Sequence, residues 1–301
     1  MIDKPTDPVR PPIVLACGFA RFDAIRESLS LMLKPAGISL PDSGHYFKGI
    51  RTHLEAHGHI VSHSKVSFAA NIETRAQELA DQINLILKET GADQVHLISH
   101  SMGGLDARHM IVGVDGMEAK IKTLSTIGTP HWGSPMADYM IENGLADWLN
   151  AFRKIIDLDG ALALTTDACL SFNQEAEAIE AENNVVYMTW SSHSAEIFRP
   201  LQSAADIVAE AEGPNDGLVS VRSQQWQSVL SGPNRDKFVR QHEIPFPADH
   251  LNQLGWWGPS DFEAPFHSLS VFSEWKRKLR ETELQAKDLY LRIANELSGL
   301  S

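Results

Sequence analysis

Six consecutive residues, Ser-His-Ser-Met-Gly-Gly from Ser99 to Gly104, constrain the fold of this chain more than any other segment. They follow a short apolar run and precede a segment with helical spacing. A strand, a sharp turn and a helix in this order typically present a nucleophilic serine at the end of a strand. The turn would strain the backbone of Ser101, so the residues two before and two after it must be small. Ser99 and Gly103 meet that demand, and Gly104 would let the helix pack closely on the strand. The alternative is a plain helix with Ser101 as its N-cap.

Composition limits the classes of protein that the chain can belong to. Its 301 residues suit one large α/β domain, or a core with an inserted cap, and leave ample chain for a sizeable core. The content of 43% hydrophobic and 22% charged residues is ordinary for a globular protein. The formal charge of −13 would repel nucleic acid and anionic membrane surfaces, so no nucleic-acid partner is expected. The two cysteines, Cys17 and Cys169, could form at most one disulfide, and we expect both to be buried thiols.

Targeting and membrane signals are absent from the sequence as written. The first twelve residues contain no apolar stretch of signal-peptide length, and no segment reaches about 18 uninterrupted apolar residues. We therefore expect no integral membrane segment. A cytoplasmic location is the expectation for the sequence as written, and secretion is the expectation if a leader has been removed.

Strand and helix patterns alternate along the first half of the chain. This alternation predicts an α/β fold with a mainly parallel sheet and helices on both faces. Active sites in such sheets lie at the carboxyl ends of the strands, where Ser101 is expected. Asn71 is the expected N-cap of the longest early helix, and Gly91 lies just past its end. The expected strands are 13–16, 60–66, 95–98, 121–127 and 185–190, with helical spacing in 47–54, 72–90 and 102–111.

A serine nucleophile needs a base, and the base needs an acid that holds it in the right tautomer. Downstream of Ser101, Asp216 precedes Gly217 in an expected tight turn, and His250 follows in Pro-Ala-Asp-His-Leu. Each has a plain alternative, a turn aspartate or an exposed loop histidine. The order serine, acid, histidine and their expected places just past sheet elements favour the catalytic interpretation. His242 and His267 are the competing bases, and both are expected to be structural or exposed.

The negative oxygen of the reaction intermediate must be held by two backbone N–H groups. We expect one to belong to Met102, at the start of the helix after the turn. The loop after the first strand contains the flexible Gly18, and we assign the second N–H group to Phe19.

These motifs together resemble the bacterial true lipases of the α/β-hydrolase superfamily. The resemblance implies carboxylic-ester hydrolysis with Ser101 as nucleophile, His250 as base, Asp216 as acid, and Phe19 and Met102 as oxyanion donors. Two residues depart from the family pattern: Cys17 stands where the family usually has histidine, and Ser99 replaces the first glycine of the turn. The resemblance rests on segments 17–23, 99–103, 128–134, 215–219 and 249–251, in family order.

Metal binding is expected to be absent. Many lipases of this kind hold a structural calcium through a carboxylate two residues after the catalytic histidine, but Asn252 occupies that place and is a weaker ligand. No cofactor is expected to be required, and calcium is doubtful. Four histidines could also suggest zinc, but without a carboxylate or cysteine partner they favour a solvated surface. They are His53, His57, His59 and His63.

Residues 135–164 are expected to form a helical lid inserted in a single domain that spans 1–301. Apolar residues recur there at helical intervals, and the segment follows the motif Gly-Thr-Pro-His-Trp-Gly-Ser at the active-site end of the sheet. An apolar face turned inward would build an acyl-binding cleft. The alternative is an ordinary helix pair on the core. Segment 266–297, by contrast, is interpreted as a core-packing helix. The expected substrate-contacting lid residues are Met140, Leu145, Trp148, Leu149 and Phe152.

Together these features predict an α/β-hydrolase with a lid that cleaves fatty-acyl esters, of the triacylglycerol type, through an acyl-enzyme. The expected partner is an ester or lipid substrate, and a lipid–water interface is left open. Three alternatives share the same triad: a short-chain carboxylesterase, a thioesterase and an acyltransferase. A non-catalytic binding protein is the alternative of a different class, and it would have no need of an intact Ser101, Asp216 and His250.

Overall fold

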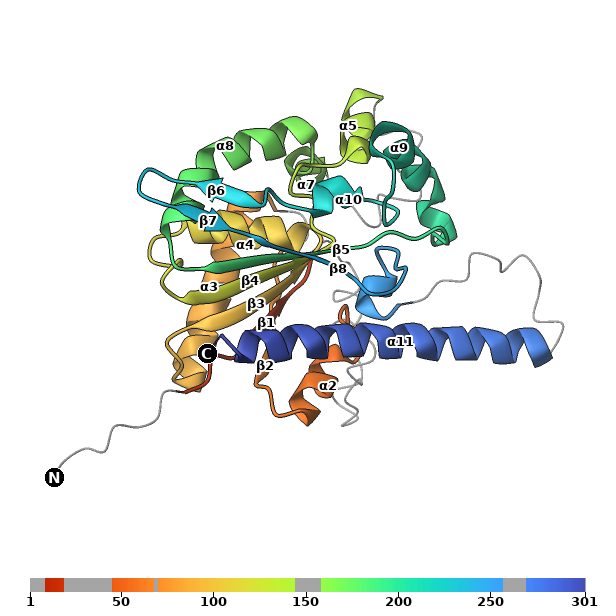
Figure 1. The fold of residues 1–301 in the computed structure, drawn as a ribbon, viewed down its shortest axis with the longest axis horizontal. Helices are drawn as coiled ribbons and strands as arrows, with labels where there is room; N and C mark the ends of the chain where they lie inside the picture. Colours follow the sequence, from red (N-terminus) through yellow and green to blue (C-terminus); the bar gives the residue numbers. More distant parts are fainter. Residues whose placement is uncertain (1–8, 19–44, 68–69, 144–157, 257–268, 301) are drawn as a thin grey trace.

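The computed structural model describes residues 9–18, 45–67, 70–143, 158–256 and 269–300. Six parallel strands form one sheet in the order β2-β1-β3-β4-β5-β8 (Figure 1). Two further strands form a separate antiparallel pair, β6-β7. The strands are β1 (Ile13–Ala16), β2 (Val61–His63), β3 (Val95–His100), β4 (Ile121–Ile127), β5 (Val186–Ser191), β6 (Val229–Ser231), β7 (Asp236–Phe238) and β8 (Arg240–Glu243).

Helices cover both faces of the six-stranded sheet, as the alternating pattern predicts. Figure 1 shows α2 and α11 on one side of the sheet and α3, α4 and α8 on the other. The helices are α2 (Ile50–Ala56), α3 (Ile72–Thr90), α4 (Met102–Gly113), α5 (Pro135–Glu142), α7 (Leu158–Ala163), α8 (Thr166–Glu182), α9 (Gln202–Glu212), α10 (Val221–Gln224) and α11 (Leu269–Ser298).

Successive residues of each strand enter two different apolar cores, because side chains alternate across a strand. On β1, Val14 packs against α3 and α4, whereas Leu15 packs against α2 and α11. Leu97 and Ile98 on β3 divide in the same way. The near-continuous apolar strands of the sequence are therefore buried on both faces, as is usual for a parallel sheet.

Several expected boundaries are confirmed by the structure. The helix predicted at 72–90 is α3, its N-cap Asn71 accepts a hydrogen bond from the Thr74 amide at 3.0 Å, and Gly91 ends it with a φ of 71°. The strands predicted at 13–16 and 121–127 have those bounds. The strand predicted at 60–66 is shorter, and Phe47 precedes α2 rather than belonging to it.

The apolar core contacts that the structure describes for the C-terminal helix lie in its second half. Leu289, Tyr290 and Ile293 are buried against α2 and the sheet, whereas Leu284 is 57% exposed. Cys17 and Cys169 are both buried thiols rather than a disulfide, as expected. Within the described residues, no helix has both the length and the hydropathy needed to cross a membrane.

Candidate active site

Ser101 occupies a strained turn between β3 and α4. Its φ of 55° and ψ of −136° make it the single non-glycine residue with a positive φ in the described part of the chain. Such a conformation costs about 1–3 kcal/mol and persists only where the surroundings enforce it. Here the Ser101 amide donates to the Ile127 carbonyl of β4 at 2.9 Å, and the Thr129 hydroxyl donates to the Ser101 carbonyl at 2.8 Å.

Glycines make room for this turn on two sides. A Cβ atom on Gly103 would lie 2.7 Å from the Cys17 carbonyl oxygen, and one on Gly104 would overlap the Thr129 side chain. Gly103 therefore provides the close approach of α4 to β1. The sequence interpretation of Gly104 as a helix–strand contact is corrected, since its neighbour is the loop after β4. Ser99 is fully buried at the place of the usual glycine.

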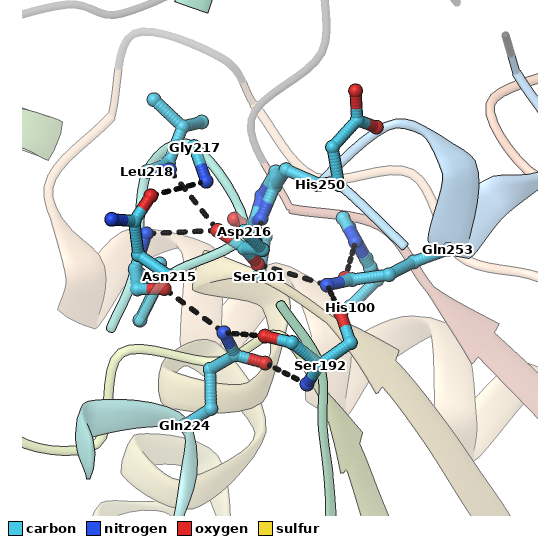
Figure 2. Close-up of polar contacts among 12 residues, drawn as sticks. His100, Ser101, Ser192, Asn215, Asp216, Gly217, Leu218, Gln224, His250 and Gln253 are labelled. Carbon is cyan, nitrogen blue, oxygen red and sulfur yellow. Dashed lines mark hydrogen bonds and ion pairs between the residues drawn. The ribbon is translucent and has the colours of Figure 1, made fainter. Parts of the chain in front are cut away.

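Asp216 and His250 come together at the same end of the sheet (Figure 2). The Nδ1 atom of His250 lies 2.8 Å from Oδ2 of Asp216, and the His250 amide donates to the Asp216 carbonyl at 2.7 Å. Both residues are buried. The predicted pair is therefore in contact, although 34 residues separate the two positions.

A short turn fixes the carboxylate of Asp216. Its Oδ1 atom accepts hydrogen bonds from the amides of Leu218 at 3.0 Å and Val219 at 2.9 Å. Gly217 in this turn has a φ of 104°, which glycine tolerates and other residues rarely adopt. The expectation that Asp216 lies just past a sheet element is wrong, because the turn follows helix α9. An aspartate-glycine turn has the same local sequence after a helix as after a strand.

The competing histidines differ in their surroundings. His242 lies on β8, half-buried, with its ring stacked on Trp190 at a centroid distance of 4.2 Å. It is therefore structural, as expected, although it is not exposed. His267 lies outside the described residues.

The N-terminus of α4 supplies one candidate oxyanion donor. Met102 is the first residue of that helix, and the first N–H groups of a helix have no acceptor within it. A Cβ atom on Gly18 would lie 3.1 Å from the Met102 nitrogen, so the loop after β1 runs directly alongside the serine turn. The other predicted donor, Phe19, lies outside the described residues.

A largely apolar cavity of about 130 Å³ lies over Ser101 and His250. Three elements outside the sheet, α5, α7 and the segment before α9, supply one part of its wall, and α5 and α9 lie side by side in Figure 1. Met140 is buried in this wall. The other predicted lid residues, Leu145, Trp148, Leu149 and Phe152, lie outside the described residues. The segment before α9 was not predicted, and it contributes Phe198, Pro200 and Leu201.

The polar side chains of the turn around His250 make hydrogen bonds to the main chain. Asp249 Oδ1 accepts from the amides of Leu251 and Asn252, and its Oδ2 accepts from the amide of Phe198 at 2.9 Å. Asn252 Oδ1 accepts from the Asp249 amide, and its Nδ2 donates to the Trp256 carbonyl. Burial raises the pKa of Asp249. These oxygens already serve the backbone of the turn.

The histidines near the N-terminus, which could have suggested a zinc site, lie apart from the cavity over Ser101. The His57 and His53 rings lie 4.6 Å apart, with His57 Nδ1 donating to the His53 carbonyl, and His63 stacks on His45. Within the described ranges, no group of three or more histidine, cysteine or acidic side chains could hold a metal ion.

Three residues that sequence reasoning missed form a chain of contacts that begins at Asp216. Gln253 contacts Asp216, His100 contacts Gln253, and Tyr46 contacts His100. His100 and Gln253 are close in sequence to Ser101 and His250, but glutamine and histidine have no spacing rule that would have identified them. Tyr46 carries no sequence signal at all.

Comparison with known proteins agrees with this geometry. Residues 63–167 match the family model of the PGAP1-like alpha/beta domain. The chain is 30% identical to triacylglycerol lipase 2 of Saccharomyces cerevisiae, covering 84% of this chain and 73% of the yeast protein. It is 28% identical to a triacylglycerol lipase of Vibrio cholerae, covering 81% and 80% of the two chains.

Solved structures share the fold at lower sequence identity. The mature lipase BlEst2 of Bacillus licheniformis aligns with a TM-score of 0.61 and 19% identity, covering 91% of this chain and 93% of its own. A lipase of Staphylococcus hyicus aligns with a TM-score of 0.58 and 17% identity, covering 100% and 98%. The similarity extends over most of each chain. The chain therefore belongs to the triacylglycerol lipase family of α/β-hydrolases and is a carboxylic-ester hydrolase.

Proposed function

We propose that this protein hydrolyses fatty-acyl esters of the triacylglycerol type, with Ser101 as nucleophile, His250 as general base and Asp216 as the acid that orients it. One observation carries the proposal: the buried 2.8 Å contact between His250 Nδ1 and Asp216 Oδ2 at the wall of the cavity that contains Ser101. A carboxylate that accepts a hydrogen bond from Nδ1 keeps the imidazole hydrogen on that nitrogen. Nε2 is then free to accept the proton of the serine hydroxyl.

The reaction proceeds in two halves. Ser101 Oγ attacks the ester carbonyl while its proton passes to His250 Nε2, and the N–H groups of Met102 and Phe19 hold the resulting oxyanion. His250 then gives the proton to the departing alcohol, which leaves an acyl-serine. Water attacks that acyl group through the same base, releasing the acid and restoring the hydroxyl of Ser101.

The acyl part of the substrate would occupy the apolar cavity. Methionine side chains from two helices, Met102 of α4 and Met136 and Met140 of α5, line it, and methionine adapts to flexible apolar partners. The relatives named triacylglycerol lipase support the same substrate class.

Residues 135–164 act as a lid in this proposal. The parts of the segment that the structure describes, α5 and α7, support it, since Met136, Met140 and Ala161 turn their side chains into the cavity wall. An opening lid would expose this apolar face, which water disfavours and a lipid surface favours.

Structural calcium is not required in this proposal. A calcium ion takes six to eight oxygen ligands, including carboxylates. At the family position, Asn252 is neutral, and the oxygens of Asp249 and Asn252 already accept backbone hydrogen bonds.

The test is turnover of p-nitrophenyl esters from acetate to palmitate by the wild type and by Ser101→Ala. We expect a maximum beyond the short chains, and a loss in kcat of about 10⁴-fold or more in the variant. An organophosphonate should label the wild type once per chain and leave Ser101→Ala unlabelled. Activity confined to acetate and butyrate would identify a short-chain carboxylesterase, and an unlabelled, inactive wild type would identify a binding protein.

A further inference from the structure

The carboxylate of Asp216 is held by a second side chain besides His250. Gln253 Nε2 donates to Asp216 Oδ2 at 2.8 Å, the same distance at which His250 Nδ1 meets that oxygen (Figure 2). The other oxygen, Oδ1, is already bound by two backbone amides. Asp216 is therefore fixed by four donors, of which Gln253 is the one supplied by a side chain outside the proposed triad.

The orientation of the Gln253 carboxamide follows from its partners. A carboxylate accepts and does not donate, so the nitrogen must face Asp216. The second hydrogen of the nitrogen points to Ser192 Oγ at 2.8 Å, and the Ser192 hydroxyl in turn donates to the Ala248 carbonyl. The carboxamide oxygen is left to accept, and His100 Nε2 lies 2.8 Å from it.

His100 is thereby restricted to one tautomer. Burial lowers the pKa of His100 well below its ordinary value, so the ring is neutral and has one N–H group. Its Nε2 must carry the hydrogen for Gln253, which leaves Nδ1 as an acceptor. The Tyr46 hydroxyl lies 2.6 Å from Nδ1 and donates to it. Every proton from Tyr46 through His100 and Gln253 to Asp216 is accounted for.

Gln253 belongs to the support of the triad and not to the substrate cavity. It is fully buried and is absent from the cavity wall, whereas His100 and Tyr46 reach that wall. The backbone also makes room for it: a Cβ atom on Gly128 would overlap the Gln253 carboxamide oxygen, and Gly128 has a φ of 58°. The first glycine of the Gly-Thr-Pro-His motif thus accommodates this side chain.

We propose that Gln253 is a positioning residue, which holds Asp216 in line with His250 Nδ1 and is itself oriented by His100. This inference rests on the proposed catalytic roles of Asp216 and His250. A donor to Oδ2 fixes where the carboxylate meets the imidazole without carrying a charge of its own. Because a small misplacement of a catalytic group is costly in rate, the loss of this donor should lower kcat while substrate binding is retained.

Among the described residues, three further titratable side chains lie around Gln253 and Asp216 besides His250. His100 of β3 contacts Gln253, and Tyr46, in the segment before α2, contacts His100. Asp249 interacts with Asp216 from the turn that holds His250. A new carboxylate at position 253 would stand against Asp216 and near the imidazole. It would favour the protonated form of His250 and raise the pH at which the free base appears.

The test uses two variants of the full chain and one control. Gln253→Met keeps the length of the side chain and removes the donor, and we expect kcat to fall about 10- to 100-fold with KM within about threefold of the wild type. Gln253→Glu keeps the shape, and we expect the acidic limb of the pH profile of kcat/KM to move about one unit to higher pH. Gln241→Glu adds the same charge at β8, where Gln241 binds Thr189 and Trp226, and should leave the limb in place.

A structural role alone would give a different pattern. If Gln253→Met lowers kcat but Gln253→Glu has the wild-type pH profile, the loss in Gln253→Met comes from disturbed packing and not from the missing donor to Asp216, and the proposal is overturned. It is overturned equally if Gln253→Met keeps kcat within about twofold of the wild type. Failure of the triad itself is seen separately, because Ser101→Ala or His250→Ala would then retain turnover whatever the Gln253 variants do.

Discussion

His250 and Asp216 are joined twice, once by the 2.8 Å contact between their side chains and once by a 2.7 Å hydrogen bond from the His250 amide to the Asp216 carbonyl. The second bond ties the loop after β8 to the turn after α9. The two loops therefore cannot separate without breaking a buried main-chain hydrogen bond. The acid and the base of the proposed triad are held as one unit.

Asp216→Asn should lower kcat by about 10⁴-fold, because an amide favours the wrong imidazole tautomer. His250→Ala should approach the defect of Ser101→Ala, since members of a triad act together. His242→Ala and His267→Ala are the controls and should stay near the wild type in steady-state ester hydrolysis. An inactive His267→Ala would assign the base to the C-terminal segment instead.

Two glycines of α4 offer a matched pair for stability. Gly103→Ala places a methyl group 2.7 Å from a backbone carbonyl and should lower the free energy of unfolding by about 1–3 kcal/mol. Gly113→Ala meets nothing within 4 Å and should be neutral or stabilising by up to about 1 kcal/mol. Urea unfolding of both variants measures the difference. Equal losses would mean that α4 does not depend on its approach to β1.

Substitutions on opposite sides of α5 test the lid. Met140→Ser should reduce palmitate ester hydrolysis about tenfold or more relative to acetate, because Met140 lines the cavity. Ile141 lies on the outer side of the helix and is 36% exposed, so Ile141→Ser should change neither palmitate nor acetate ester hydrolysis. The double variant Trp148→Ser, Phe152→Ser should show the same chain-length effect as Met140→Ser. The activity of the wild type should rise disproportionately once the substrate exceeds its solubility limit. An equal loss on all chain lengths with a lower melting temperature would identify the segment as core.

Removal of calcium should have little effect. Dialysis against a chelator should change the melting temperature by less than about 2 °C, because a ligand that bound the native state would shift it with concentration. Differential scanning fluorimetry with and without added calcium measures this. A large drop that calcium reverses would show that other residues complete a site.

Buried histidines should make the protein sensitive to acid. Burial lowers the pKa of His96 to about 4, against 6.5 in the unfolded chain, so the unfolded state binds more protons between these values. The contribution of His96 to stability is thus complete above pH 6.5 and is lost as the pH falls toward 4. Between pH 7 and pH 4.5, the free energy of unfolding of His96→Asn should fall by about 2 kcal/mol less than that of the wild type. Parallel curves for the two proteins would contradict this.

The sequence predicted the parts of the fold that have a clear hydrophobic pattern. Strands β1, β3 and β4 and helix α3 have continuous or periodic apolar residues, and their places were predicted within two residues. Helix α8 was missed because its buried face carries polar side chains, Asn173 and Glu180, which bind the buried Arg108 at 2.8 Å. A helix buried through an ion pair has no apolar stripe for a sequence pattern to detect.

The proposed triad was predicted from local motifs and chain order, whereas its support was not. Ser101 and His250 stand in motifs whose local geometry is encoded by their neighbours. Gln253 acquires its role only through Asp216, 37 residues away, and through His100, 153 residues away. Contacts over such separations depend on the completed sheet and leave no trace in neighbouring residues.

The two halves of the site are built on different parts of the molecule. The serine turn is hydrogen-bonded to β4 and lies close against β1, while one part of the cavity wall comes from α5, α7 and the segment before α9, which lie outside the sheet. Substitutions in that wall can alter which acyl groups fit without moving the reacting atoms, and distant substitutions tend to add independently. Chemistry and substrate range can therefore diverge separately during evolution or in directed selection, with α5 and the segment before α9 as the places to diversify.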